Sequence, residues 1–349
     1  MTSHRPDNSG ESLAGGGRLR WPALTGSPVL ASIRPVIEKS RHVQTNIAKV
    51  IEHAGWMAYE ELPLPEFGPL VGLRRDPEQA IDFILVATTI NFAFTHFQTQ
   101  EKFQVDYAGR HWWDAEALFA CMQRALEEGI PFLDAHYLRA IRRADLERIF
   151  RGNIELPLLD ERVEILRSVG EVLAQGYAGR FHHFVESAPP RLYDNGQGLL
   201  ERLVREFPRF NDVSEYEGQE IRFYKLAQLG CWVMYSALGP SGGFRLEDAE
   251  KMTAFADYIV PAALRVMDIL TYSPGLEKAI QSQQLIPRDS PQEIEIRAHT
   301  LYATALLCDE VNQRRPPEIQ VIIPQIDARL WSHYHTTFWP HHLTPTIMY

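Results

Sequence analysis

Apolar residues recur at helical spacing along most of the chain, and this repeat limits the possible fold more than any other feature. In ERVEILRSVGEVLAQG, residues 161–176, the apolar positions share one helix face; they are Val163, Leu166, Val169, Val172 and Leu173. Similar stripes cover residues 30–54, 114–128, 136–151, 197–207, 222–237, 247–270 and 295–313. The sequence therefore predicts a mainly α protein.

The signal for β-strands is thin. KFQVDYAGRHWWD contains two short alternating runs around an Ala-Gly turn, so we expect one small β-hairpin near residues 102–113. The turn clusters between the helical stripes are too short to be domain linkers. Residues 1–27 are rich in Gly, Ser and Pro. We therefore expect a disordered tail over residues 1–27 and one helical domain over residues 28–349.

Charge and cysteine content exclude several classes of protein. The 35 Lys and Arg residues against 45 Asp and Glu residues give a net charge of −10, which disfavours a polymeric nucleic-acid partner. Cys121, Cys231 and Cys308 show no CxxC spacing, which fits a reducing cytoplasm better than a disulfide framework. No apolar run reaches the roughly 20 residues that span a bilayer, and the N-terminus lacks a signal-peptide core. We expect a cytoplasmic protein that does not cross a membrane, with a monomer favoured.

The C-terminal run LWSHYHTTFWPHHLTPTIMY contains four histidines, His333, His335, His341 and His342. Neither an HExxH motif nor a carboxylate at ligand spacing accompanies them, so a zinc site is disfavoured. The chain also lacks GxxxxGK[ST] and a GxGxxG after a strand. Most common cofactor classes are therefore unsupported.

FADYIVP, residues 255–261, places an acid four residues before a proline. Pro261 has no N–H, and its ring presses on the carbonyl of residue 257, so a helix here must kink or break. On a helical wheel Asp257 lies opposite the apolar face, and the pattern alone favours a solvated surface charge. The alternative is an acid held at a kink that lines a cavity.

Two further charged positions allow a similar choice. Lys225 lies in the largely apolar run FYKLAQL, where a lysine usually extends to the surface. Turned inward, it would require an anion. Glu293 and Arg297 have the i,i+4 spacing typical of an exposed helical ion pair.

INFAFTHF, residues 90–97, combines an amide with closely spaced aromatic residues. Phe92 and Phe94 could stack on a planar base while Asn91 reads its hydrogen-bonding edge. A buried strand or helix end with a satisfied Asn91 explains the pattern equally well.

Several blocks of the chain, in this order, resemble one family. They are SRHV (40–43), INFAF (90–94), ALEEGIP (125–131), LPLLDERVEIL (156–166), EYEGQEIRFYKLAQL (215–229), FADYIVP (255–261), EIEIRA (293–298) and the run that ends at Tyr349. Together they are similar to the queuosine salvage proteins, the queuosine 5′-phosphate N-glycosylase/hydrolase family. The chain departs from the family pattern at Thr88, where an acid is usual, and at Ala262, where Gln is usual.

The resemblance implies a fold similar to the helix-hairpin-helix DNA glycosylases. It also implies cleavage of the N-glycosidic bond of queuosine 5′-monophosphate, which yields ribose 5-phosphate and queuine, a 7-deazaguanine base. Neither a metal nor a cofactor is expected. By the same resemblance, Asp257 and Lys225 are the expected catalytic residues.

The substrate-binding residues expected from the resemblance are Asn91, Phe92, Phe94, His96, Tyr258, Glu293, Glu295, Arg297 and Tyr349. Glu293 or Glu295 would pair with the cationic amine of queuine. Lys225, Arg297 and a C-terminal histidine or tyrosine are candidates for the 5′-phosphate.

Two alternatives are weighed against this enzyme. The first is a non-catalytic helical protein that binds a modified nucleoside or nucleotide. The second is a DNA glycosylase, which the net charge of −10 disfavours.

Overall fold

The computed structural model describes residues 21–22, 26–65, 76–335 and 339–349. The α-helices are α1 (Pro28–Ser32), α2 (Arg34–Lys39), α3 (Ile47–Met57), α4 (Pro77–Thr89), α5 (Asp114–Glu127), α6 (Ala135–Ala140), α7 (Arg143–Ile149), α8 (Leu159–Gly176), α9 (Phe181–Glu186), α10 (Leu199–Glu206), α11 (Lys225–Leu238), α12 (Ile259–Val266), α13 (Pro274–Gln281), α14 (Pro291–Asn312) and α15 (Ile323–Tyr334). The strands are β1 (Val43–Thr45), β2 (Gln104–Tyr107), β3 (Arg110–Trp113), β4 (Val213–Tyr216), β5 (Gln219–Arg222) and β6 (Leu270–Tyr272). The predicted mainly α class is confirmed, whereas the likeness to helix-hairpin-helix glycosylases stays a prediction.

Most of the predicted N-terminal tail lies outside the described residues. Trp21 is one of the tail residues that the structure describes. Its ring lies 5.5 Å from that of Tyr302 on α14, and the Arg34 guanidinium lies 4.6 Å from the Trp21 ring. None of the helices described is both long and apolar enough to cross a bilayer.

The hairpin expected near residues 102–113 is confirmed as β2 and β3, which pair antiparallel. Ala108 and Gly109 both have positive φ, as a two-residue hairpin turn requires. Two further strand pairs were not expected. β4 pairs with β5 around a similar turn at Glu217 and Gly218, and β1 pairs with β6 from the distant end of the chain.

Three of the predicted helical stripes are interrupted. The stripe over 30–54 is divided among α1, α2, β1 and α3, and the stripe over 136–151 forms α6 and α7. The largest correction concerns residues 247–270. Residues 252–256 are not helical, and α12 begins only at Ile259. Pro261 therefore lies in the first turn of a helix, where its missing N–H leaves no bond unmade.

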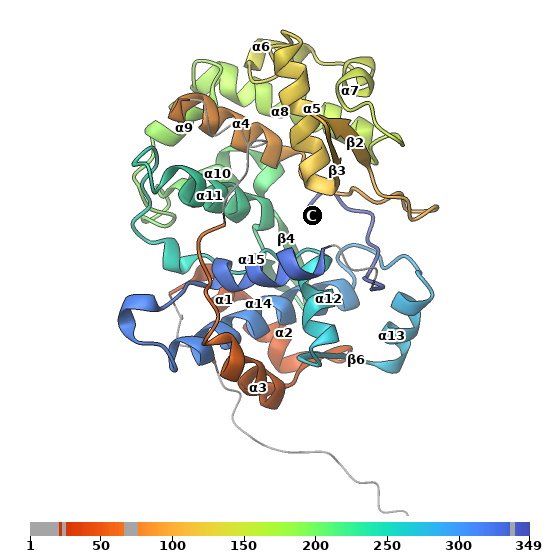
Figure 1. Cartoon of the computed structure of the whole chain (residues 1–349), viewed down its shortest axis with the longest axis vertical. Helices are drawn as coiled ribbons and strands as arrows, with labels where there is room; N and C mark the ends of the chain where they lie inside the picture. Colours follow the sequence, from red (N-terminus) through yellow and green to blue (C-terminus); the bar gives the residue numbers. More distant parts are fainter. Residues whose placement is uncertain (1–20, 23–25, 66–75, 336–338) are drawn as a thin grey trace, which may run out of the picture.

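The buried apolar side chains form two clusters. One is built mainly from α4 to α11, and the other from α1 to α3 with α12 to α15. Figure 1 shows these groups as the upper and lower halves of the molecule, with the C-terminus between them. α4 and α14 are buried on nearly all sides, as expected of the central helices of a helical protein.

Candidate active site

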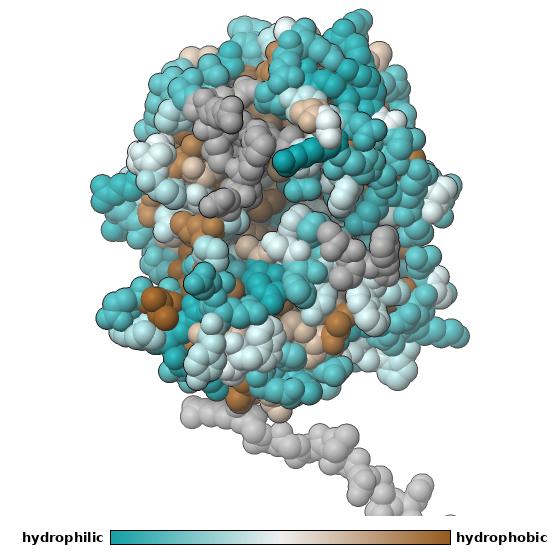
Figure 2. Space-filling model, in the orientation of Figure 1, coloured by the Kyte–Doolittle hydropathy of each residue, from teal (hydrophilic) through white to brown (hydrophobic). Residues whose placement is uncertain are grey.

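A cavity of about 520 Å³ lies between the two halves. Its walls come from α4 and the segment after it, from β3 and the first half of α5, from α11, from the residues before α12, and from α15. Figure 2 shows a largely hydrophilic surface with hydrophobic side chains in the hollow at its middle. Of the predicted site residues, the cavity is lined by Asn91, Phe92, Phe94, Lys225, Asp257, Tyr258 and Tyr349.

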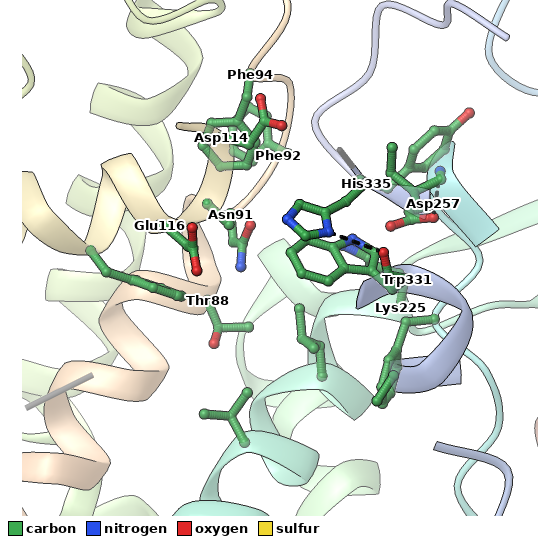
Figure 3. A pocket seen from close by; sticks show the side chains of 18 of the residues that line it. Thr88, Asn91, Phe92, Phe94, Asp114, Glu116, Lys225, Asp257, Trp331 and His335 are labelled. Atoms are coloured by element: carbon green, nitrogen blue, oxygen red, sulfur yellow. Dashed lines mark hydrogen bonds between the residues drawn. The ribbon is translucent and has the colours of Figure 1, made fainter. Parts of the chain in front are cut away.

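Asp257 is only 7% exposed, so the solvated charge favoured by the helical wheel is wrong. Its Oδ1 accepts hydrogen bonds from the backbone N–H groups of Ile259 at 2.8 Å and Val260 at 2.9 Å. These are orphan N–H groups at the start of α12, so the carboxylate caps that helix. None of the described residues donates a hydrogen bond to Oδ2. The cap thus fixes the carboxylate while leaving one oxygen for the cavity (Figure 3).

Lys225 is the first residue of α11 and is 6% exposed, so it is not a surface lysine. Its backbone N–H donates to Asp212 at 3.2 Å. Its ammonium forms no hydrogen bond or ion pair with the residues that the structure describes, although it lines the cavity. Burial lowers the pKa of Lys225, and the carboxylates of Asp257 and Asp327 oppose that shift.

Asp327, on α15, lines the same part of the cavity and was not predicted. Its Oδ2 accepts the backbone N–H of Phe255 at 2.8 Å. Burial and the neighbouring Asp257 raise the pKa of Asp327 well above its usual range. Burial also raises the pKa of Asp257, but Lys225 and the two backbone N–H groups favour its charged form. With two backbone N–H donors against one for Asp327, Asp257 is the better stabilised carboxylate of the pair.

Arg297 lies behind the cavity rather than in it. Its guanidinium binds Asp212 in a bidentate ion pair at 3.0 and 2.6 Å, and both side chains are buried. Glu293 lies 3.6 Å from Arg297 and accepts the hydroxyl hydrogen bond of Tyr349 at 3.0 Å. The prediction of an exposed helical ion pair is therefore wrong. Glu293, Arg297 and Asp212 form a buried network that positions Tyr349 and the start of α11.

Glu295 also lies outside the cavity, contrary to its expected contact with the base. It is fully buried, and its Oε2 accepts backbone N–H bonds from Arg41, His42 and Val43 at 3.1, 2.6 and 3.0 Å. Its Oε1 accepts the hydroxyl hydrogen bond of Tyr216 at 3.0 Å. Glu295 therefore anchors the entry to β1.

We expect Glu295→Ala to lower the free energy of unfolding by about 3 kcal/mol, because three backbone N–H groups and the Tyr216 hydroxyl lose their buried acceptor. Urea unfolding followed by circular dichroism measures this loss. Glu164→Ala, at an exposed position on α8, is the matched control and should change stability little. A loss no larger than that of the control would show that water replaces the carboxylate.

The remaining predicted positions also differ from expectation. His96 is half-buried outside the cavity, and its Nδ1 accepts the Thr99 backbone N–H at 3.1 Å. Burial lowers the pKa of His342 to about 3, so this C-terminal histidine is neutral and cannot pair its charge with a phosphate. The described residues contain no group of three potential metal ligands.

The aromatic wall expected from INFAF is present and is supported from behind. Two buried guanidinium groups lie over the Phe92 ring, that of Arg162 at 4.1 Å and that of Arg209 at 4.9 Å. Both donate to backbone carbonyls, Arg162 to Phe92 and Arg209 to that of Thr89. These bonds fix the segment that carries Asn91 and Phe92.

Trp331, Asp114 and Glu116 were missed because α15 and the β3–α5 junction gave no chemical motif, whereas His335 is one of the C-terminal histidines considered for the phosphate. Trp331, in the last turn of α15, and His335, directly after the helix, stack at 4.3 Å and face the cavity (Figure 3). Asp114, at the start of α5, binds Lys102 at 2.7 Å. Glu116 lines the cavity two residues later. The aromatic spacing of WSHYH on a helix was the available signal for the first pair.

Comparison with known proteins identifies the family of the chain. The family model "Queuosine salvage protein" matches residues 72–349. A Sphaerobacter thermophilus protein named "Queuosine 5'-phosphate N-glycosylase/hydrolase" is 35% identical, over 92% of this chain and 97% of its own length. Proteins with the same name from Mus musculus and Bos taurus are each 30% identical, over 86% and 80% of this chain and 91% and 80% of their own lengths. The chain therefore belongs to the queuosine salvage protein family.

Proposed function

We propose that this chain hydrolyses the N-glycosidic bond of queuosine 5′-monophosphate and releases queuine and ribose 5-phosphate. The observation that supports this most strongly is the position of Asp257. One carboxylate oxygen is fixed by two backbone N–H groups, and the other is free to meet a ligand in a cavity that contains Lys225. Relatives that carry this activity in their names align with nearly the whole chain.

The chemistry requires a fixed negative charge beside the sugar. As the bond from C1′ to the base nitrogen breaks, positive charge builds on C1′ and the ring oxygen, and the ionised carboxylate of Asp257 stabilises it. A water molecule then bonds to C1′ and transfers a proton to Asp257, while the electron pair of the broken bond leaves with the base. The base nitrogen takes up a proton from solvent. A positioned group of this kind contributes about 10²–10⁴ in rate.

The leaving base limits where activation can act. A 7-deaza base has no N7 to protonate, so the reaction depends mainly on stabilising the sugar cation. Phe92, Phe94 and Trp331 provide apolar faces for the base. Arg297 is occupied by Asp212, so Lys225 is the buried cation of the cavity that can meet the phosphate or keep Asp257 ionised.

Mixing the purified chain with queuosine 5′-monophosphate tests the proposal directly. Release of free queuine, followed by chromatography, is the expected result. Tight binding of the intact nucleotide without release would favour the runner-up, a non-catalytic carrier. Salt-independent absence of binding to duplex DNA is also expected, given the net charge of −10.

We expect Lys225→Met to shift the acid limb of the pH–turnover profile to higher pH. The Lys225 ammonium lowers the pKa of Asp257, so its removal raises that pKa, and ionised Asp257 appears only at higher pH. Turnover measured from pH 4 to 8 gives the limb. Lys278→Met, at an exposed lysine on α13, is the control. An acid limb at the same pH in Lys225→Met would show that Lys225 does not affect the ionisation of Asp257.

We further propose that the protein acts as a monomer in the cytoplasm. Its three cysteines are buried free thiols, which a reducing compartment maintains. Sedimentation of the purified chain at micromolar concentration tests the monomer.

A further inference from the structure

Two polar side chains on the wall that α5 and the segment after α4 form have no hydrogen-bond partner in the part of the chain that the structure describes. They are Asn91, in the segment after α4, and Glu116, on the first turn of α5. Both line the cavity, and Asn91 is 9% exposed. Figure 3 shows the Asn91 amide and the Glu116 carboxylate pointing toward one another. Unpaired polar groups in a partly buried site cost free energy unless a ligand supplies their partners.

The two groups together define a hydrogen-bonding pattern. The carboxylate of Glu116 accepts two bonds, and the Nδ2 of Asn91 donates one. The complementary ligand edge carries two adjacent N–H donors followed by a carbonyl acceptor. A guanine-type ring has this edge, with its exocyclic amino group, its ring N–H and its carbonyl. A 7-deazaguanine ring retains it, because the deaza position lies in the other ring.

We propose that Glu116, with Asn91 beside it, reads the amino, imino and carbonyl edge of the substrate base. This inference rests on the proposed function. Thr88, which also lines the cavity, donates its hydroxyl to the Ile84 carbonyl at 2.6 Å and provides no charge. α4 packs against α5, and this packing brings Glu116 of α5 beside Asn91, which follows α4.

The pose is consistent with the proposed chemistry. Figure 3 shows Asp257 and Lys225 on the other side of the cavity from Glu116 and Asn91. A nucleotide can therefore direct its base edge toward α5 and its C1′ toward the start of α12. Burial raises the pKa of Glu116, with His335 opposing that shift, so donors from a ligand would stabilise its charged form.

Binding of free bases tests the inference without turnover. Calorimetry is performed with 7-deazaguanine and with 7-deazahypoxanthine, which lacks the exocyclic amino group. The unmodified chain should prefer 7-deazaguanine by at least about 10-fold. Glu116→Gln should weaken 7-deazaguanine binding roughly 10- to 100-fold and remove most of the preference. Glu164→Gln, at an exposed position on α8, should change neither value.

Three results would overturn the inference. The first is a Glu116→Gln variant with unchanged affinity and preference, and the second is an unmodified chain that binds neither base. The third comes from a further titration with queuine: a loss of affinity in Glu116→Gln that is seen with queuine and not with 7-deazaguanine. The carboxylate would then bind the cationic amine of queuine rather than the base edge. Glu116→Ala, with its thermal midpoint recorded, repeats the test without a new amide. If the chain does not hydrolyse queuosine 5′-monophosphate but still prefers 7-deazaguanine, the proposed hydrolase activity is contradicted, whereas recognition of the base edge by Glu116 is not.

Discussion

Asp257→Asn should lower turnover of queuosine 5′-monophosphate by about 10²- to 10⁴-fold while the nucleotide still binds. The substitution removes the charge that stabilises the sugar cation. It retains an oxygen that can accept the backbone N–H groups of Ile259 and Val260, so the cap of α12 is preserved. Initial rates of queuine release and calorimetric binding of the nucleotide measure the two effects separately.

Asp268→Asn is the matched control for this prediction. Asp268 is exposed, follows the end of α12 and has positive φ, a conformation that Asn tolerates well. Its turnover should equal that of the unmodified chain. If the turnover of Asp257→Asn stays within a few-fold of that of the control, Asp257 has no catalytic role.

Asp212→Ala should lower the free energy of unfolding by about 3–5 kcal/mol, because it leaves the Arg297 guanidinium buried without its bidentate partner. Urea unfolding measures the loss. Asp160→Ala is the comparison, since Asp160 pairs with Arg143 at 2.7 Å but is 72% exposed. Such a surface pair contributes about 0–1 kcal/mol.

Replacing all three charged groups of this buried network tests the cause of that loss. The triple variant Asp212→Leu, Glu293→Gln and Arg297→Met leaves no unpaired charge and should be more stable than Asp212→Ala alone. A triple variant that is as unstable as Asp212→Ala would attribute the loss to packing or to the Lys225 backbone bond, rather than to an unpaired charge.

The local features of the fold were predictable from the sequence. The β2–β3 hairpin has its strands and its turn within a dozen residues, so alternation and the Ala-Gly pair were sufficient. The helical class followed from periodicity. The same reasoning failed at residues 252–256, because apolar spacing cannot distinguish a helix from a buried extended segment. It also missed the β1–β6 pair, whose strands are far apart in the chain.

The site was predictable only where the family resemblance supplied it. Lys225 and Arg297 look like surface residues because the carboxylates that face them, Asp257 and Asp212, come from distant elements. Glu295 resembled a ligand group, yet its oxygens bind the backbone of residues 41–43. Asp327 and Glu116 carry no motif, and only the packing of α15 and α5 reveals them. Partners that meet through tertiary packing leave no local pattern.

The central claim is that Asp257 stands beside the bond that breaks. A crystal structure of the Asp257→Asn variant with intact queuosine 5′-monophosphate tests it most directly. We predict that C1′ lies about 3–3.5 Å from the residue 257 side chain, as a reactive geometry requires. A nucleotide bound outside the cavity, or with its C1′ turned away from α12, would contradict the account.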